Sequence, residues 1–270
     1  MAAGPQYVVL DPSVAEGTGK LVALQRHGEA EKNVVLKADK TRLKAEVAAE
    51  LAAGATRESP SVEKRMADWD ALSKSERWFD DSLDAAGVQQ AMAAGRELAA
   101  WLRGAGVAAP AACCVSPFRR ALQTQEFGYR AAGFEATGGL LGDGTPWIAR
   151  DELRETPYDE ASFRRHDTRL LAKWLPLLDT SGIDAVNTAS EPVTQLTGPI
   201  FGDGGNCRGI LEANAEAFVA WLRGRREAFL WVTTHQGPAR EILAHVFGPG
   251  DRGYDHDLKN ATCVVFRLPA

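Results

Sequence analysis

Short apolar runs alternate with longer amphipathic segments along most of the chain. Four runs predict buried strands, because each is short, mostly apolar and bounded by polar or turn-forming residues. Strands that alternate with helices favour a mainly parallel sheet covered on both faces. The pattern therefore predicts an α/β fold, with a three-layer α/β/α arrangement around a mainly parallel central sheet. The four predicted strands cover residues 21–24, 111–115, 229–233 and 262–266.

Two segments between these runs have clear helical spacing. Residues 88–104 and 211–224 each repeat apolar side chains at helical intervals and end on a glycine. A single apolar stripe followed by glycine is typical of a helix that packs on a sheet and then stops.

Residues 37–80 depart from the simple alternation, because they are strongly charged. Leu43, Val47 and Leu51 lie one turn apart in this segment. A second helix is expected to begin at Pro60, since proline suits the first turn of a helix. We interpret the segment as an insertion whose two amphipathic helices form a lid on the rim of a site.

A second insertion is expected at residues 160–209, which are irregular and rich in glycine, threonine and aspartate. Neither insertion resembles an independent domain. The chain is therefore predicted to form a single domain over residues 1–270.

Composition narrows the class of protein. The chain is 45% hydrophobic and carries a formal net charge of -5, which argues against a general binder of nucleic acids or membrane surfaces. The N-terminal residues lack a basic start followed by a long apolar run, and no apolar stretch approaches the ~18 residues of a membrane span. The four cysteines have no metal-site spacing, so reduced thiols and a cytoplasmic location are expected. Oligomeric state does not follow from the sequence.

Histidine, arginine and carboxylate side chains follow the predicted strands. In a parallel sheet the carboxyl ends of the strands share one edge, where ligands bind. We expect the side chains that follow these strand ends to converge there. They are Arg26 and His27, Arg119 and Arg120, Glu152 and Glu155, and His235.

This set of side chains suits phosphoryl transfer. Arginine binds phosphate oxygens through paired N–H groups, and a neutral imidazole can attack phosphorus and carry the phosphoryl group. A carboxylic acid can protonate the leaving oxygen. The chemistry needs no metal or cofactor, and the sequence has no glycine-rich loop ending in Lys-Ser or Lys-Thr, which disfavours a nucleotide-driven enzyme.

Six segments then resemble the histidine phosphatase superfamily, which includes the phosphoglycerate mutases. The first is Arg-His-Gly-Glu at 26–29, with Asn33 six residues past the histidine. DDSLDAAGVQQA (80–91) is similar to the family's Asp-x-x-Leu-Thr-x-x-Gly segment, and SPFRRALQT (116–124) to its Ser-Pro-Leu-x-Arg-Ala segment. LRE (153–155) resembles the family's Leu-x-Glu, THQG (234–237) its second-histidine segment and NATCVVF (260–266) its closing strand. All of them occur in family order.

The resemblance implies a phosphoglycerate mutase-like fold and a role for each matched residue. His27 is the expected nucleophile and Glu155, rather than Glu152, the expected proton donor. Gln236 stands where the phytase branch has an aspartate, so the chain resembles the mutase-like branch. The residues implied to bind the transferring phosphoryl group are Arg26, Arg120 and His235, and those expected to contact substrate are Asn33, Gln236, Arg164 and Arg165.

Three functions follow as expectations from the sequence. The first is a metal-independent phosphatase that hydrolyses a small-molecule phosphomonoester through a phosphohistidine intermediate. The alternative is a mutase, which is disfavoured because Thr-Pro-Tyr-Asp follows Glu155 where mutases have Arg-x-Tyr-Gly. A non-catalytic relative that binds phosphorylated ligands is the third, although every expected catalytic position is filled.

Overall fold

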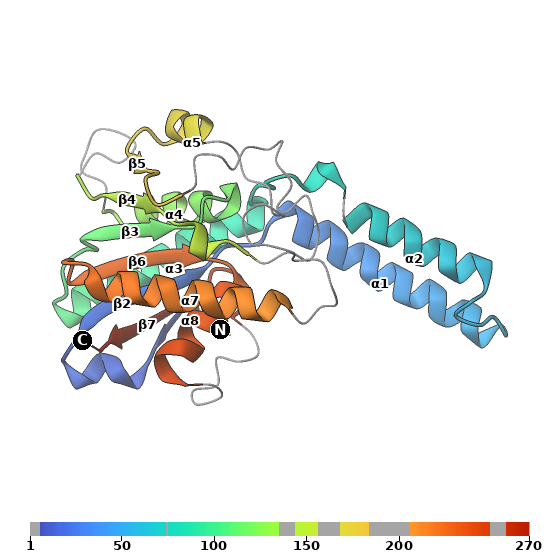
Figure 1. The fold of residues 1–270 in the computed structure, drawn as a ribbon, viewed down its shortest axis with the longest axis horizontal. Helices are drawn as coiled ribbons and strands as arrows, with labels where there is room; N and C mark the ends of the chain where they lie inside the picture. Colours follow the sequence, from blue (N-terminus) through green and yellow to red (C-terminus); the bar gives the residue numbers. More distant parts are fainter. Residues whose placement is uncertain are drawn as a thin grey trace, which may run out of the picture.

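The computed structural model describes residues 6–73, 75–134, 144–155, 168–183, 206–248 and 258–269. Seven strands form one sheet in the order β1-β7-β2-β6-β3-β4-β5 (Figure 1). The bounds are Val8–Leu10 (β1), Lys20–Arg26 (β2), Ala112–Val115 (β3), Trp147–Ala149 (β4), Leu178–Asp179 (β5), Phe229–Thr234 (β6) and Cys263–Leu268 (β7).

The sheet is mainly parallel, as the alternating pattern predicts. Strand β2 pairs in parallel with β6, and β6, β3, β4 and β5 continue in parallel. Strand β7 is antiparallel to β2, and β1 is parallel to β7. The sequence pattern does not reveal β1 and β5, because three- and two-residue strands are too short for a period to show.

Helices cover both faces of the sheet, which confirms the three-layer arrangement (Figure 1). One core cluster joins side chains of the sheet to α3 and α4, including Leu98, Leu102 and Leu122. The other joins the opposite sheet face to α7 and α8, including Phe218 and Ile242. These helices span Ala85–Ala105 (α3), Arg119–Ala131 (α4), Asn206–Gly224 (α7) and Gln236–Phe247 (α8), and Thr168–Trp174 forms the short α5.

Gln25 is a buried polar residue within the otherwise apolar β2. Its amide Nε2 donates to the carbonyl oxygen of Ala261 at 3.2 Å, and its Oε1 accepts from the indole Nε1 of Trp231 at 3.0 Å. Because buried polar groups must be hydrogen-bonded, this side chain is tolerated where an apolar residue is expected. It ties β2 to β6 and to the turn that precedes β7.

The first insertion forms a helical hairpin that projects from the body of the protein (Figure 1). Its helices are α1 (Glu31–Ala52) and α2 (Pro60–Ser73), so the helix start expected at Pro60 is confirmed. The expectation of a lid is wrong for this structure, because the hairpin extends outward and α1 has no buried residue. The apolar stripes of the two helices line a shared groove that stays partly open, and neither stripe packs on the rim of the sheet.

The second insertion, expected at 160–209, is described only over α5, β5 and the start of α7. Cys113, Cys114 and Cys263 are buried, and none of these three forms a disulfide. Among the described helices, none is both long and apolar enough to cross a membrane.

Candidate active site

His27 and His235 lie side by side at the carboxyl edge of the sheet. The register of β2 and β6 places Arg26 opposite Thr234, so both histidines directly follow paired strand ends. The backbone N–H of His27 donates to the carbonyl oxygen of Thr234 at 2.8 Å. The imidazole centroids are 4.9 Å apart, and both side chains are buried. The convergence expected from the strand ends is therefore present for this pair.

Glycine allows the loop after His27 to lie directly against α3. A Cβ added at Gly28 would lie 2.5 Å from the carbonyl oxygen of Gly87, and one added at Gly87 would lie 2.0 Å from that of Glu29. Neither gap admits a side chain. The hydroxyl of Thr124 also accepts from the backbone N–H of Gly28 at 3.0 Å. Three of the sequence segments named above are thus packed into one loop-and-helix unit around His27.

The hydrogen bonding of His27 sets its tautomer. Nδ1 of His27 lies 2.6 Å from the carbonyl oxygen of Gly28. Because a carbonyl oxygen only accepts, Nδ1 carries the proton in this contact and Nε2 keeps its lone pair. Nε2 is therefore the nitrogen available to attack an electrophile.

Burial and positive charge keep both imidazoles neutral. Desolvation lowers the pKa of His27 well below its ordinary value, and the charges of Arg120 and Arg26 lower it further. Desolvation also lowers the pKa of His235. The neighbouring groups that lower it further are Arg120, His27, Arg26 and Arg154. A neutral imidazole is the form that can act as a nucleophile.

His235 is held from one side by Ser116. The hydroxyl of Ser116 lies 2.8 Å from Nε2 of His235. Nδ1 of the same ring is buried and makes no hydrogen bond with the described residues. A buried polar atom is normally satisfied, so a bound oxygen of a ligand would complete this site.

The adjacent residues Arg119 and Arg120 have different partners. Nη1 of Arg120 lies 2.8 Å from Oδ1 of Asp81 in a buried ion pair. Arg119 instead contacts the loop before α3, where its backbone N–H donates to Asp80 at 2.6 Å and its Nη1 to Ser82 at 3.3 Å. The charge of Arg120 acts on both His27 and His235, and Arg120 is the arginine that the sequence resemblance implies as a phosphate ligand.

Arg154 is a further cation at the site, and the sequence reasoning did not single it out. Its guanidinium lies over the ring of Phe118 at 5.4 Å, and that of Arg120 lies over the same ring at 5.0 Å. Its charge acts on His235. The signal was available in the sequence, because Arg154 stands between Leu153 and Glu155 in the segment that supplies the acid.

The two candidate carboxylates have different surroundings. Oε1 of Glu155 lies 2.5 Å from the position of a Cβ added at Gly237, two residues past His235. Glu152 instead forms an ion pair with Arg150. Glu155 therefore lies against the first turn of α8, at Gly237, whereas Glu152 is held in an ion pair.

The remaining expected site residues are less enclosed. Arg26 ends β2 and donates from Nη1 to the carbonyl oxygen of Leu258. Asn33 is exposed in the first turn of α1, and Gln236 is half-buried as the first residue of α8. Arg164 and Arg165 lie outside the described residues. Within the described part of the chain, no group of three or more His, Cys, Asp or Glu side chains is arranged to hold a metal ion.

Comparisons with known proteins give similarity only at the level of structure. No family model and no curated protein matches the sequence. The chain is similar to a mycobacterial hydrolase with 15% identity and a TM-score of 0.47, covering 91% of this chain and 90% of that one. It is similar to YhfR of Bacillus stearothermophilus with 17% identity and a TM-score of 0.47, covering 91% and 89%.

A third solved structure is a mycobacterial glucosyl-3-phosphoglycerate phosphatase, with 15% identity and a TM-score of 0.44, covering 90% of this chain and 88% of that one.

Proposed function

We propose that the chain is a histidine phosphatase of the mutase-like branch, which hydrolyses a phosphomonoester through a phosphohistidine at His27 without a metal. The observation that carries the proposal is the contact between Nδ1 of His27 and the carbonyl oxygen of Gly28. It leaves Nε2 of a buried, neutral imidazole unprotonated, beside a second histidine and buried positive charge. An imidazole so arranged is suited to attack phosphorus.

In the first half-reaction, Nε2 of His27 attacks phosphorus and the bond from phosphorus to the ester oxygen breaks. Arg26, Arg120 and Nδ1 of His235 bind the equatorial oxygens, where negative charge is held in the transition state. The leaving oxygen takes a proton from Glu155 and departs as the alcohol.

In the second half-reaction, a water molecule attacks the phosphohistidine. The carboxylate of Glu155 takes a proton from this water as the new P–O bond forms, and the P–N bond breaks to return His27 to its starting form. Phosphate leaves, and Glu155 is again protonated. Each residue thus ends the cycle in the state in which it began.

A phosphoglycerate mutase is the second candidate within the same chemistry. It would return the phosphoryl group of His27 to an acceptor hydroxyl instead of water. The sequence after Glu155 departs from the mutase pattern, which favours hydrolysis. Conversion of 3-phosphoglycerate to 2-phosphoglycerate, measured beside phosphate release, separates the two.

The test uses 4-nitrophenyl phosphate and the variant His27→Ala. We expect the wild type to release phosphate and to yield phosphorylated His27 when quenched in alkali and examined by mass spectrometry. His27→Ala should lose both signals while keeping the circular dichroism of the wild type. Hydrolysis by the variant at a near wild-type rate would refute the mechanism. A wild type that binds phosphate esters without turnover would instead indicate a non-catalytic phosphate-binding protein.

A further inference from the structure

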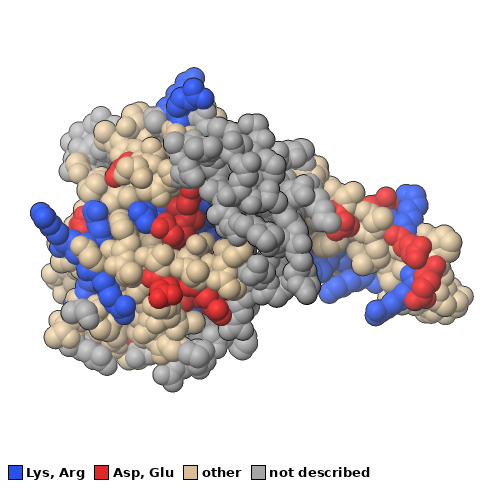
Figure 2. Space-filling model, in the orientation of Figure 1, with Lys and Arg blue, Asp and Glu red and all other residues tan. Residues whose placement is uncertain are grey.

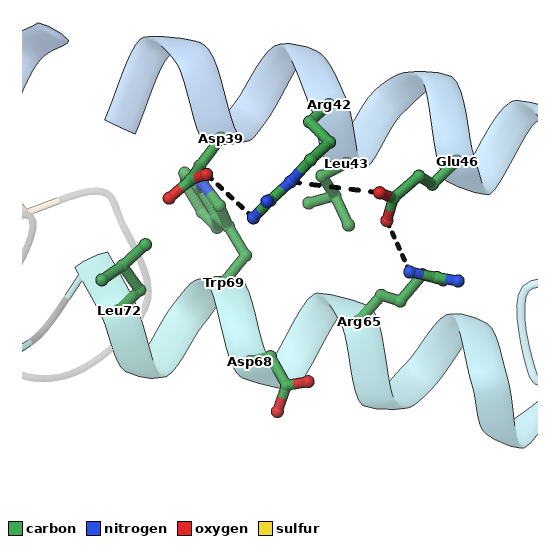
Figure 3. A pocket seen from close by; sticks show the side chains of 8 residues that line it. All are labelled: Asp39, Arg42, Leu43, Glu46, Arg65, Asp68, Trp69 and Leu72. Atoms are coloured by element: carbon green, nitrogen blue, oxygen red, sulfur yellow. Dashed lines mark hydrogen bonds and ion pairs between the residues drawn. The ribbon is translucent and has the colours of Figure 1, made fainter. Parts of the chain in front are cut away.

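The carboxylates that α1 carries beyond its first turn are used within the hairpin. Arg42 pairs with Asp39 at 2.9 Å, and Arg65 of α2 pairs with Glu46 at 2.5 Å (Figure 3). Arg65 also pairs with Glu50 at 2.6 Å. All these groups lie along one side of the seam between the helices. Two arginine charges thus offset most of the charge of these three carboxylates on that side.

Three lysines occupy another side of the same helix. Lys37, Lys40 and Lys44 are spaced by three and four residues, so they form a row along one face of α1. All three are exposed, and none forms an ion pair with a described acidic residue, although Lys40 Nζ lies 5.7 Å from the centroid of the Trp69 ring. In Figure 2, Lys and Arg side chains lie along the lower edge of the projecting hairpin. The row therefore presents uncompensated positive charge, although the whole chain is acidic.

An apolar groove runs beside this lysine row. Its volume is about 340 Å³ and it lies between α1 and α2. Met66 is 50% exposed and Leu51 is 38% exposed, although both are large apolar side chains. An open apolar surface with charge along its rim is typical of a surface that binds another molecule. The groove is lined by Leu43, Val47, Ala48, Leu51, Met66 and Trp69, with Lys40 and Lys44 on its rim.

The start of α1 connects this surface to the candidate active site. The backbone N–H of Lys32 donates to Asp81 at 3.3 Å, and Asp81 in turn holds Arg120. Asn33 precedes Lys37 by four residues and so lies on the face of the lysine row. With a rise of about 1.5 Å per residue, Lys37 lies about 6 Å along the helix from Asn33, and Leu51 about 27 Å.

We propose that the hairpin docks an acidic, partly apolar polypeptide segment, and that the phosphomonoester cleaved at His27 is carried by that polypeptide. The substrate assignment rests on the proposed function. The lysine row supplies the charge complementarity for acidic residues, and the groove accepts apolar ones further out. A surface about 27 Å long exceeds the reach of the small-molecule ester expected from the sequence. A flat anionic membrane would not fill a concave groove.

The geometry fixes the design of a peptide probe. An extended chain advances about 3.3 Å per residue, so the lysine row matches positions two to five residues from the phosphorylated one, and the end of the groove about eight residues. Each probe carries one phosphoserine or phosphotyrosine, Glu at the near positions and Leu at the far ones, on either side of the phosphoresidue. The matched control probes have Gln in place of Glu.

The kinetic test compares kcat/KM for the Glu and Gln probes. We expect the Glu probe to be at least about 10-fold better in one chain direction, with the advantage reduced in 0.5 M salt because exposed charges are screened. Lys37→Glu, Lys40→Glu and Lys44→Glu together should bring the ratio to one or below. Arg96→Glu with Arg103→Glu on α3 is the control and should keep the wild-type ratio. A ratio of one in the wild type, or an unchanged ratio in the lysine variant, would overturn the proposal.

A binding test keeps this inference separable from the proposed function. The probe is a fluorescein-labelled Glu/Leu peptide without phosphate, and fluorescence anisotropy reports its affinity for the full chain. We expect the lysine variant to bind at least about 10-fold more weakly, whether or not the protein hydrolyses 4-nitrophenyl phosphate. Equal affinity would overturn the docking role even in an active phosphatase.

Two further measurements distinguish the proposed polypeptide from a membrane surface and from a second copy of the chain as the occupant of the groove. Preferential binding to vesicles containing phosphatidylserine, without any difference between the peptides, would replace the polypeptide with a membrane surface. A dimer in sedimentation that dissociates when Leu51 and Met66 are changed to Glu would assign the groove to a second copy. Either outcome would overturn the proposal.

Discussion

Asp81 and Arg120 form a buried ion pair beside the two histidines. Oδ1 of Asp81 lies 2.8 Å from Nη1 of Arg120, and the side chains are 4% and 7% exposed. A guanidinium carries five N–H donors, so the pair leaves the other N–H groups of Arg120 to bind phosphate oxygens. Asp81 is therefore in a position to fix the orientation of the arginine that is proposed to bind the phosphoryl group.

The Asp81–Arg120 pair leads to a prediction about kinetics. Asp81→Ala leaves Arg120 without its partner, and misplacement of a binding group costs up to about 10²-fold in rate. We expect kcat for 4-nitrophenyl phosphate to fall by about 10- to 100-fold. Asp81→Asn keeps an oxygen that accepts from Nη1, so it should recover most of the rate. Equal kcat in the alanine variant and the wild type would show that Asp81 does not position Arg120.

The contrasting surroundings of Glu155 and Glu152 lead to a second prediction. Glu155→Gln should slow poor leaving groups, such as sugar phosphates, by about 10²- to 10⁴-fold, because those oxygens need a proton. Activated aryl phosphates should be affected far less. Glu152→Gln is the control, since that carboxylate is paired with Arg150. Steady-state kcat/KM on both substrate types checks the assignment, and the reverse pattern would move the acid to Glu152.

Metal dependence gives a third prediction. Arginine and histidine side chains provide the positive charge in the proposed mechanism, so exhaustive dialysis against a chelator should leave kcat unchanged. Phosphate release from 4-nitrophenyl phosphate is measured before and after dialysis. Loss of activity that only a divalent ion restores would assign the reaction to metal-assisted hydrolysis.

Asp80 leads to a prediction about stability and pH. Burial raises the pKa of this carboxyl to about 6, despite its hydrogen bond from the backbone N–H of Arg119 and the charges of Arg120 and Arg119. Because the folded pKa exceeds the unfolded value, the folded state loses stability as pH rises from about 4 to 6, on the order of 2–3 kcal/mol in all. Asp80→Asn removes this penalty and keeps an acceptor oxygen.

The measurement is urea unfolding of the wild type and Asp80→Asn across the pH range. The variant should be more stable than the wild type at pH 7, and the difference should shrink to about zero near pH 4. A difference that is constant with pH would show that Asp80 titrates normally.

The close contact at Gly87 gives a fifth prediction. A Cβ there would lie 2.0 Å from the carbonyl oxygen of Glu29, so Gly87→Ala must displace the loop after His27. We expect a loss of about 3 kcal/mol in unfolding free energy, the upper end for an overpacked site. Gly104→Ala in the same helix meets no atom within 4 Å and should stabilise it by about 0.5–1 kcal/mol. Urea unfolding of both variants checks the contrast.

The sequence predicts the central strands and the histidine pair well, for a physical reason. Strands β2 and β6 are buried on both faces, so they are nearly continuous apolar runs that end abruptly at Arg26 and Thr234. An abrupt end in a parallel sheet also locates the ligand-binding edge. The same logic does not reach Asp81, whose pairing with Arg120 depends on how a loop folds back over α4.

The direction of the hairpin could not be read from the sequence. The spacing of Leu43, Val47 and Leu51 shows that α1 has an apolar stripe, but not which surface covers it. Its partner is α2, with Trp69 and Met66, rather than the sheet. The pattern therefore predicted two helices correctly and their placement as a lid incorrectly.

The two strands that flank β2 in the sheet come late in the chain, which has a consequence for biosynthesis. β2 pairs with β6, which follows it by about 210 positions in the chain, and with β7, which follows it by about 240. During translation, the strand that ends in Arg26 therefore emerges from the ribosome long before either of its neighbours exists. Pairing across such a separation is slow, because the intervening chain must first be ordered. The nascent chain must keep an apolar, unpaired strand in solution through most of its synthesis, which makes it a strong candidate for protection by chaperones.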